Sequence, residues 1–264
     1  MRKLEPVVLS LALALLAGAP LSRAHEFWME PQAFRTAAGA KVPVRFFVGQ
    51  YFKGSSIPWL ENYQSVYFAD ARGTENIRGV LGDDPAATIA PRAPGRIAVV
   101  MRSGSYELLY EKPGEFEEFL KKDGLDHLVP RGFKAKLPLK ETYSRNAKSL
   151  LVSGAAPAGS PPDRAYGLTL ELVAESDPYA GKTGPFTVKA LYNGSPLPNA
   201  LVTGFHKAAP DRRIEGRTDA AGRARLTLER KGVWLLNVVH LLPAQKKSGA
   251  QWETLWSSLT FEIP

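Results

Sequence analysis

The sequence contains no cysteine and only four histidines among its 264 residues. Without cysteine the chain forms no disulfide bond, even in an oxidising compartment. A metal site in this protein must therefore use nitrogen and oxygen ligands, with methionine sulfur as the only soft donor.

Catalytic signatures are also missing. The chain has no Gly-x-Ser-x-Gly nucleophile elbow, no phosphate-binding loop, no His-Glu-x-x-His motif and no dinucleotide fingerprint. No pair of acids stands out as a general acid and base. These absences argue against hydrolase, kinase and dehydrogenase classes, and we expect a protein that is not an enzyme.

The charge pattern gives little support for nucleic acid as a partner. The formal net charge is +8, but lysine and arginine are scattered among acidic residues. No basic block with interleaved aromatic residues is present, so we expect no nucleic-acid binding.

Residues 1–24 have the three parts of a secretory signal peptide. Arg2 and Lys3 open the chain, an apolar run covers 7–17, and Ser22 and Ala24 put small residues at the −3 and −1 positions of a cleavage site. The apolar run is shorter than the roughly 20 residues that span a bilayer. We expect cleavage after Ala24, a periplasmic protein and no membrane insertion of the mature chain; an uncleaved anchor is the alternative.

The remaining sequence is typical of short β-strands separated by turns rich in glycine and proline. Strands are predicted at 42–48, 65–69, 96–101 and 106–110, and the last two flank a hairpin signal at 103–105. From residue 182 about six short strands follow, with a tight turn at Asn193-Gly194. This spacing is typical of an immunoglobulin-like sandwich.

Two helices are predicted within the first half. Residues 114–124 have apolar residues three and four apart, acids early, bases late and a closing glycine. Residues 140–151 are also amphipathic at helical spacing. We therefore expect an all-β fold of two immunoglobulin-like β-sandwich domains, 25–175 with a helical insertion and 182–264, joined by a linker at 176–181.

Several segments resemble the DUF4198 domain family of periplasmic proteins, sometimes labelled NikM-like. The matching segments are Ala24-His25-Glu26-Phe27-Trp28, Glu118-Phe119-Leu120 with Gly124-Leu125, Glu141-x-Tyr143-Ser144-Arg145-x-Ala147-Lys148, Gly194-x-Pro196-Leu197-x-Asn199-Ala200-x-Val202, Thr218-Asp219-x-x-Gly222 and Gly232-x-Trp234-Leu235-Leu236. The resemblance implies an exported protein with paired β-sandwiches and an association with nickel, cobalt or other transition-metal handling. The 194–236 half also resembles the carboxypeptidase-regulatory-type sandwich, which is a likeness of fold alone.

Histidine provides the candidate metal ligands. Cleavage after Ala24 would free the α-amino group of His25, and that amine and the ring Nδ1 can chelate one metal ion. A third nitrogen from His240 or His206, which lie near strand ends in the second sandwich, would complete a histidine brace. His127 follows the first predicted helix and is expected to have a helix-end role, while Glu26 is a further candidate ligand.

The sequence therefore favours a periplasmic accessory protein that binds Ni, Co or Cu through His25 and His240 or His206. It would pass the ion to a membrane metal-uptake system. Two alternatives stay open: a β-sandwich interaction module that binds a protein or glycan, and a copper oxidase with an N-terminal histidine brace.

Overall fold

The computed structural model describes residues 26–155 and 160–264, and these residues are mostly β-strand with one α-helix. Within these two ranges, three sheets account for all the strands. No helix in this part of the chain is long and apolar enough to cross a membrane. The described residues also contain three single-turn 3-10 helices: η1 (Asp126–Leu128), η2 (Pro178–Ala180) and η3 (Lys246–Ser248).

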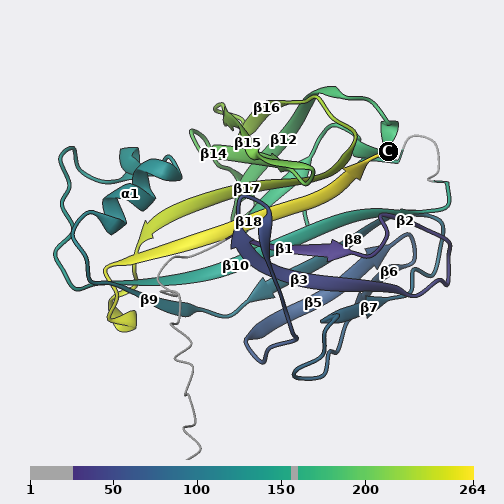
Figure 1. Ribbon diagram of the computed structural model, residues 1–264, viewed down its shortest axis with the longest axis horizontal. Coiled ribbons are helices and arrows are strands. Elements are labelled where there is room, and N and C mark those ends of the chain that lie inside the picture. The colour runs from purple at the N-terminus through teal and green to yellow at the C-terminus, as the bar shows by residue number, and fades with distance from the viewer. Residues whose placement is uncertain (1–25, 156–159) are drawn as a thin grey trace, which may run out of the picture.

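The largest sheet has ten strands and runs through the middle of the molecule (Figure 1). Its order is β15 (Ala209–Arg217), β14 (Leu201–His206), β17 (Gly232–Pro243), β18 (Trp252–Ile263), β10 (Leu139–Ser153), β8 (Gly95–Ser103), β5 (Tyr63–Asp70) and β6 (Gly73–Asn76), while β2 (Arg35–Thr36) and β9 (Tyr106–Tyr110) also pair with β10. The central neighbours β10 and β18 are parallel, and nine residue pairs join them.

Two smaller sheets cover different parts of the large one. One contains β1 (Glu26–Pro31), β3 (Val42–Gln50), β4 (Lys53–Ile57) and β7 (Ala87–Ile89). The other contains β11 (Leu170–Ala174), β12 (Gly184–Tyr192), β13 (Ser195–Pro196) and β16 (Arg223–Leu228). Each smaller sheet closes its own apolar core against the large sheet, the first with Phe46 and Phe68 and the second with Phe186 and Phe261.

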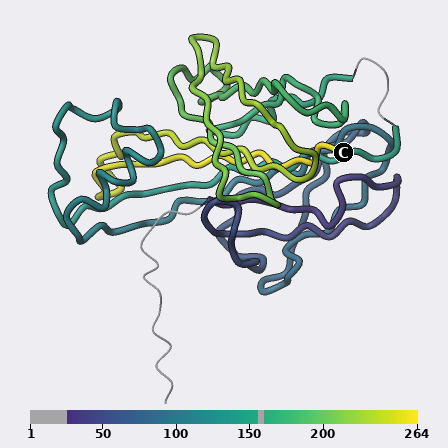
Figure 2. Tube along the Cα trace, turned by 45° about the horizontal axis from the view of Figure 1, so that its top comes forward, coloured from purple at the N-terminus to yellow at the C-terminus, as the bar shows by residue number. Residues whose placement is uncertain are grey.

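The predicted helix at 114–124 is confirmed as α1 (Glu115–Lys122). Acidic residues occupy its first turn and lysines its last, which complements the helix dipole. Phe116 and Leu120 are buried in a third core that includes Trp256 of β18. In Figure 2, β10, β17 and β18 extend past the two smaller sheets, and the α1 region lies over their far ends. The third core fills the space between them.

The helix predicted at 140–151 is wrong, because these residues form the long strand β10. Ala147 and Leu151 belong to the first core and Leu150 to the second, so β10 is buried on both faces. An amphipathic helix would bury only one side of its surface. A short apolar segment does not by itself distinguish such a helix from a buried strand. Pairing with β18, β8 and β9 decides the conformation.

The strands on either side of Gly104 are confirmed, but they do not form the predicted hairpin. Both β8 and β9 run antiparallel to β10, and they pair with successive parts of it. The chain therefore continues in the same direction past Gly104 instead of reversing.

The predicted boundary near 176–181 coincides with η2, between β11 and β12. Strand β11 pairs with β12 across this turn, and β10 pairs with β18 in the large sheet. Strands from both sides of the predicted boundary therefore share two sheets. The predicted tight turn is confirmed: Asn193 and Gly194 have φ values of 48° and 77° and join β12 to β13.

Candidate functional site

Two of the three histidines proposed as metal ligands, His206 and His240, are among the described residues, and they lie on different strands. His25 precedes the described residues, so its position is not defined. His206 ends β14, where it is buried, its Nε2 lies 2.9 Å from the carbonyl oxygen of Lys231, and its ring meets Trp234 edge-on at 4.9 Å. A ring held in this way is part of the packing at the end of β14.

His240 lies on β17, on the neighbouring strand. His206 pairs with Trp234, and His240 is six residues further along β17. At about 3.4 Å per residue, the two histidines are about 20 Å apart. The structure therefore does not bring them to one ion.

His240 instead lies near His127, and both line a small cavity of about 20 Å³. Burial lowers the pKa of His240, and the nearby His127 lowers it further. The Nδ1 atom of His127 lies 3.0 Å from the carbonyl oxygen of Gly124, directly after α1. Among the residues placed by the structure, no group of three His, Asp or Glu side chains could hold a metal ion.

A pocket lies beside α1, between this helix and the end of β3. This α1 pocket has a volume of about 160 Å³. It is lined by Gln50, Tyr110, Glu115, Glu118, Phe119, Lys122 and Asp123. Gln50 follows Gly49, the β3 residue that pairs with Glu26, so the pocket and the first described residue are neighbours. Three carboxylates and one ammonium group line the pocket, which favours a cationic ligand.

Glu26 is buried at the start of β1, with 5% of its surface exposed. Burial raises its pKa to about 7, although Lys122, Arg213 and the backbone N–H of Tyr51 favour the charged form. Its Oε2 atom has no hydrogen-bond partner within the described residues. A buried carboxylate oxygen without a partner is costly, so this end of β1 is suited to receive a positive group.

Two further carboxyl groups near the pocket have raised pKa values. Burial raises the pKa of Asp123, the residue after α1, to about 6. Burial also raises the pKa of Glu141 to about 7, against the effect of hydrogen bonds from Thr254 and Tyr110. Tyr110 lines the pocket, and its hydroxyl donates to Glu141 Oε2 at 2.8 Å, so this residue connects Glu141 to the pocket wall.

The sequence offers Glu26 as a candidate ligand, but it gives no such signal for Asp123 or Glu141. Asp123 falls within the predicted helix at 114–124, and Glu141 falls within the predicted helix at 140–151, which does not form. The signal for Glu141 is its place in a strand that is buried on both faces, where a carboxyl group requires a partner.

Two solved structures align with most of the chain. The D0-D1 domain of intimin is 12% identical, with 90% of this chain and 97% of that chain covered and a TM-score of 0.21. A tetra-tandem repeat from the extending region of a large adhesion protein is 13% identical, with 90% of this chain and 49% of that chain covered and a TM-score of 0.20. No curated protein matches the sequence.

A family match covers most of the chain, residues 22–241, and its description is "Domain of unknown function (DUF4198)". It includes β1 with Glu26, all of α1, and β10 with Glu141. The chain belongs to the DUF4198 family.

Proposed function

We propose that this protein is an exported, periplasmic accessory protein that binds a transition-metal ion at the N-terminal end of β1. It would deliver that ion to a membrane metal-uptake system. The observation that supports the proposal is the buried Glu26 carboxylate, whose Oε2 has no partner among the described residues.

His25 directly precedes Glu26 in the chain. Consecutive Cα atoms are about 3.8 Å apart, so the chain itself keeps His25 next to Glu26. Cleavage after Ala24 would create an α-amino group there, and the amine and the imidazole would supply two nitrogen donors. Glu26 would supply an oxygen donor, and Asp123 would increase the negative potential around the ion.

The donor set restricts the choice of metal. Two nitrogens and a carboxylate suit Ni(II), Co(II) and Cu(II), and a chain without cysteine offers no thiolate. Because His206 and His240 are about 20 Å apart along the sheet, at most one of them can join His25 at the same ion.

Calorimetric titration of two forms of the protein tests this proposal. One form begins at His25, and the other carries one extra glycine before it. We expect micromolar or tighter binding of Cu(II), Ni(II) or Co(II) by the first form and at least tenfold weaker binding by the second, which lacks the chelating amine. Equal affinity of the two forms would refute the N-terminal site.

The matched variants are Glu26→Gln, His240→Ala and His206→Ala. Glu26→Gln should weaken binding because it removes the charged oxygen donor. At most one of the two histidine variants should weaken it. If both histidine variants fold but neither binds metal, both histidines would contact the ion. That result would contradict their separation of about 20 Å along the sheet.

The interaction-module alternative is supported by one exposed feature. Val80 and Leu81 are neighbours on the loop between β6 and β7, with 66% and 61% of their surfaces exposed. An exposed apolar pair at a loop tip suits contact with another macromolecule. If no transition metal raises the melting temperature of the form that begins at His25, this alternative is favoured, because a ligand of the folded state must stabilise it.

We also propose that the fold consists of two immunoglobulin-like sandwiches. The two apolar cores suggest two immunoglobulin-like sandwiches that share the ten-stranded sheet, with η2 as the turn between them. Limited proteolysis should then cut near residues 176–182 less readily than a flexible linker, because β11 and β12 pair across this turn.

A further inference from the structure

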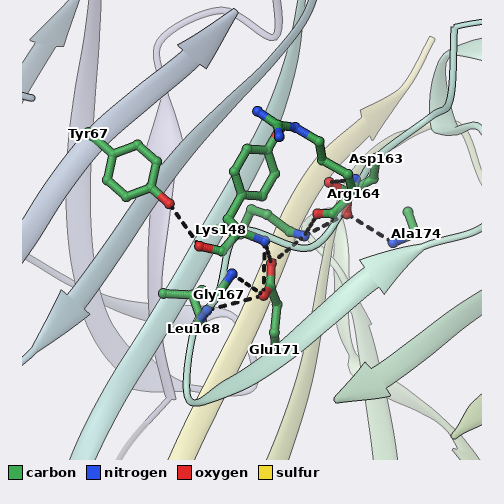
Figure 3. A network of polar contacts seen from close by, with 9 residues as sticks. Tyr67, Lys148, Asp163, Arg164, Gly167, Leu168, Glu171 and Ala174 are labelled. Atoms are coloured by element: carbon green, nitrogen blue, oxygen red, sulfur yellow. Dashed lines mark hydrogen bonds and ion pairs between the residues drawn. The ribbon is translucent and has the colours of Figure 1, made fainter. Parts of the chain in front are cut away.

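A fully buried lysine lies between two buried carboxylates, away from the α1 pocket (Figure 3). Lys148 is on β10, Glu171 is on β11, and Asp163 lies in the connection between these strands. Their side chains are 1%, 2% and 0% exposed, respectively. Lys148 Nζ is 2.7 Å from Asp163 Oδ2 and 3.2 Å from Glu171 Oε1.

Every donor of the ammonium group is used. Besides the two carboxylates, Lys148 Nζ donates to the carbonyl oxygen of Arg164 at 3.1 Å. The ring of Tyr166 covers Nζ at 5.2 Å, and the Tyr67 hydroxyl donates to the carbonyl oxygen of Tyr166. The lysine is held in one position and shielded from solvent.

The carboxylates are held by backbone N–H groups. Asp163 accepts from Arg164 N at Oδ1 (2.8 Å) and from Ala174 N at Oδ2 (3.0 Å). Glu171 accepts from three consecutive N–H groups, those of Tyr166, Gly167 and Leu168. Glu171 therefore accepts from one more backbone N–H group than Asp163 does.

The Lys148–Asp163 ion pair lies beside an apolar core. Leu150, Leu168 and Leu172 of the same region belong to the second apolar core. In such a medium separated charges are costly, and a proton shift from ammonium to carboxylate gives a neutral amine beside a neutral carboxylic acid. Lys148 Nζ is 2.7 Å from Asp163 Oδ2. Because Oδ2 is bonded to Cγ, the nitrogen lies within about 4 Å of that carbon, close to the separation of about 3–3.5 Å from which attack occurs.

We propose that Lys148 and Asp163 form an intramolecular isopeptide bond, with Glu171 as the proton-transfer group. The lysine ammonium first gives a proton to Asp163. The free amine then attacks Cγ of Asp163, and the new C–N bond gives a tetrahedral intermediate. Glu171 takes a proton from the nitrogen and returns it to the departing hydroxyl, which leaves as water.

The reaction balances without any other reagent. One ammonium and one carboxylate become one amide and one water molecule, and Glu171 ends in its starting state. The N–H groups of Arg164 and Ala174 face the two oxygens of Asp163, where negative charge develops in the intermediate. The product replaces a buried ion pair with a neutral amide.

In this cysteine-free chain the bond would crosslink two segments, as a disulfide does in other proteins. It would close a ring over residues 149–162 and tie the connection before β11 to β10. A crosslink of this kind stabilises the fold by limiting the unfolded chain.

Mass spectrometry of the full chain, purified after export, tests the proposal. We expect the intact mass to be lower than the sequence mass of the mature chain by one water molecule. Trypsin cuts after unmodified Lys148, and residues 149–163 contain no other lysine or arginine. The crosslinked protein should therefore give one peptide, 146–164, that lacks one water, instead of the separate peptides 146–148 and 149–164.

Three variants complete the test. Lys148→Arg and Glu171→Gln should restore the full mass, the first by removing the amine and the second by removing the proton acceptor. Lys189→Arg, on β12, should keep the water loss. A folded wild-type protein with the full mass, or with water lost from a freely released 149–164 peptide, would overturn the bond and leave a permanent ion network. Water loss retained in Glu171→Gln would overturn the role of Glu171.

Discussion

The hydroxyl of Tyr110 on β9 donates a 2.8 Å hydrogen bond to Glu141 Oε2 on β10, inside the core that α1 covers. The other carboxylate oxygen of Glu141 accepts from the Thr254 hydroxyl of β18. Three strands therefore meet at one buried carboxyl group, whose neighbours connect it to the α1 pocket.

Removal of the tyrosine hydroxyl should destabilise the protein. Tyr110→Phe keeps the ring packed against Phe116 but leaves Glu141 with one partner fewer. We expect a loss of about 1–3 kcal/mol in the free energy of unfolding, the usual cost of an unsatisfied buried group. Urea unfolding measures it, and a loss below about 0.5 kcal/mol would show that the hydrogen bond contributes little.

Stability should rise as the pH falls from 8 to 5. Burial raises the pKa of Glu26 and Glu141 to about 7 and that of Asp123 to about 6. In the unfolded chain these groups titrate near 4, so between about pH 4.5 and 7 the folded state binds more protons. Their contribution is complete below about pH 4.5 and is lost as the pH rises through the folded-state values.

Unfolding by urea at pH 5, 6, 7 and 8 measures this dependence. Glu141→Gln should flatten the slope, whereas the exposed control Glu61→Gln should leave it unchanged. An unchanged slope in Glu141→Gln would mean that the Glu141 carboxyl does not hold its proton in this pH range.

Gly49 should not tolerate a side chain. A Cβ atom there would lie 1.9 Å from the carbonyl oxygen of Lys53 and 2.4 Å from the Cα of Gly54, both in the β3–β4 hairpin beside Glu26. We expect Gly49→Ala to cost about 1–3 kcal/mol, the range for overpacked sites. Thermal unfolding against the exposed control Ser55→Ala checks this, and equal melting temperatures would contradict the close approach.

Trp28 should be the main side chain that joins β1 to the large sheet. Its ring stacks on Phe47 at 5.3 Å and packs in one cluster with Phe205 and Leu235. Trp28→Ala should cost about 3–5 kcal/mol. Trp28→Phe should cost much less, because the indole N–H has no partner within the described residues. Equal losses in the two variants would indicate that the indole N–H, and not the ring area, matters.

The histidine pair near the end of α1 can be followed by NMR. Burial and His127 lower the pKa of His240, so its ring should titrate below the usual value of about 6.5. His127→Gln should move the pKa of His240 upward, because it removes the neighbouring positive charge. No change in this variant would show that burial alone lowers the pKa of His240.

Local patterns in the sequence determined several elements. Helix α1 was predictable because its apolar spacing, early acids, late lysines and following glycine all act within one short segment. The turn at Asn193-Gly194 was predictable for the same reason, since these residues accept positive φ at little cost. Family membership, too, was visible from motifs alone.

Features that depend on residues far apart in the sequence were decided only by the tertiary structure. β10 is a strand because β8, β9 and β18 pair with it and both its faces are covered, which no local pattern records. The register between β14 and β17 separates His206 from His240. The register between β1 and β3 places Glu26 next to Gly49, near the α1 pocket. The same long-range packing brings Lys148, Asp163 and Glu171 together, because burial of three charged side chains requires that they satisfy one another.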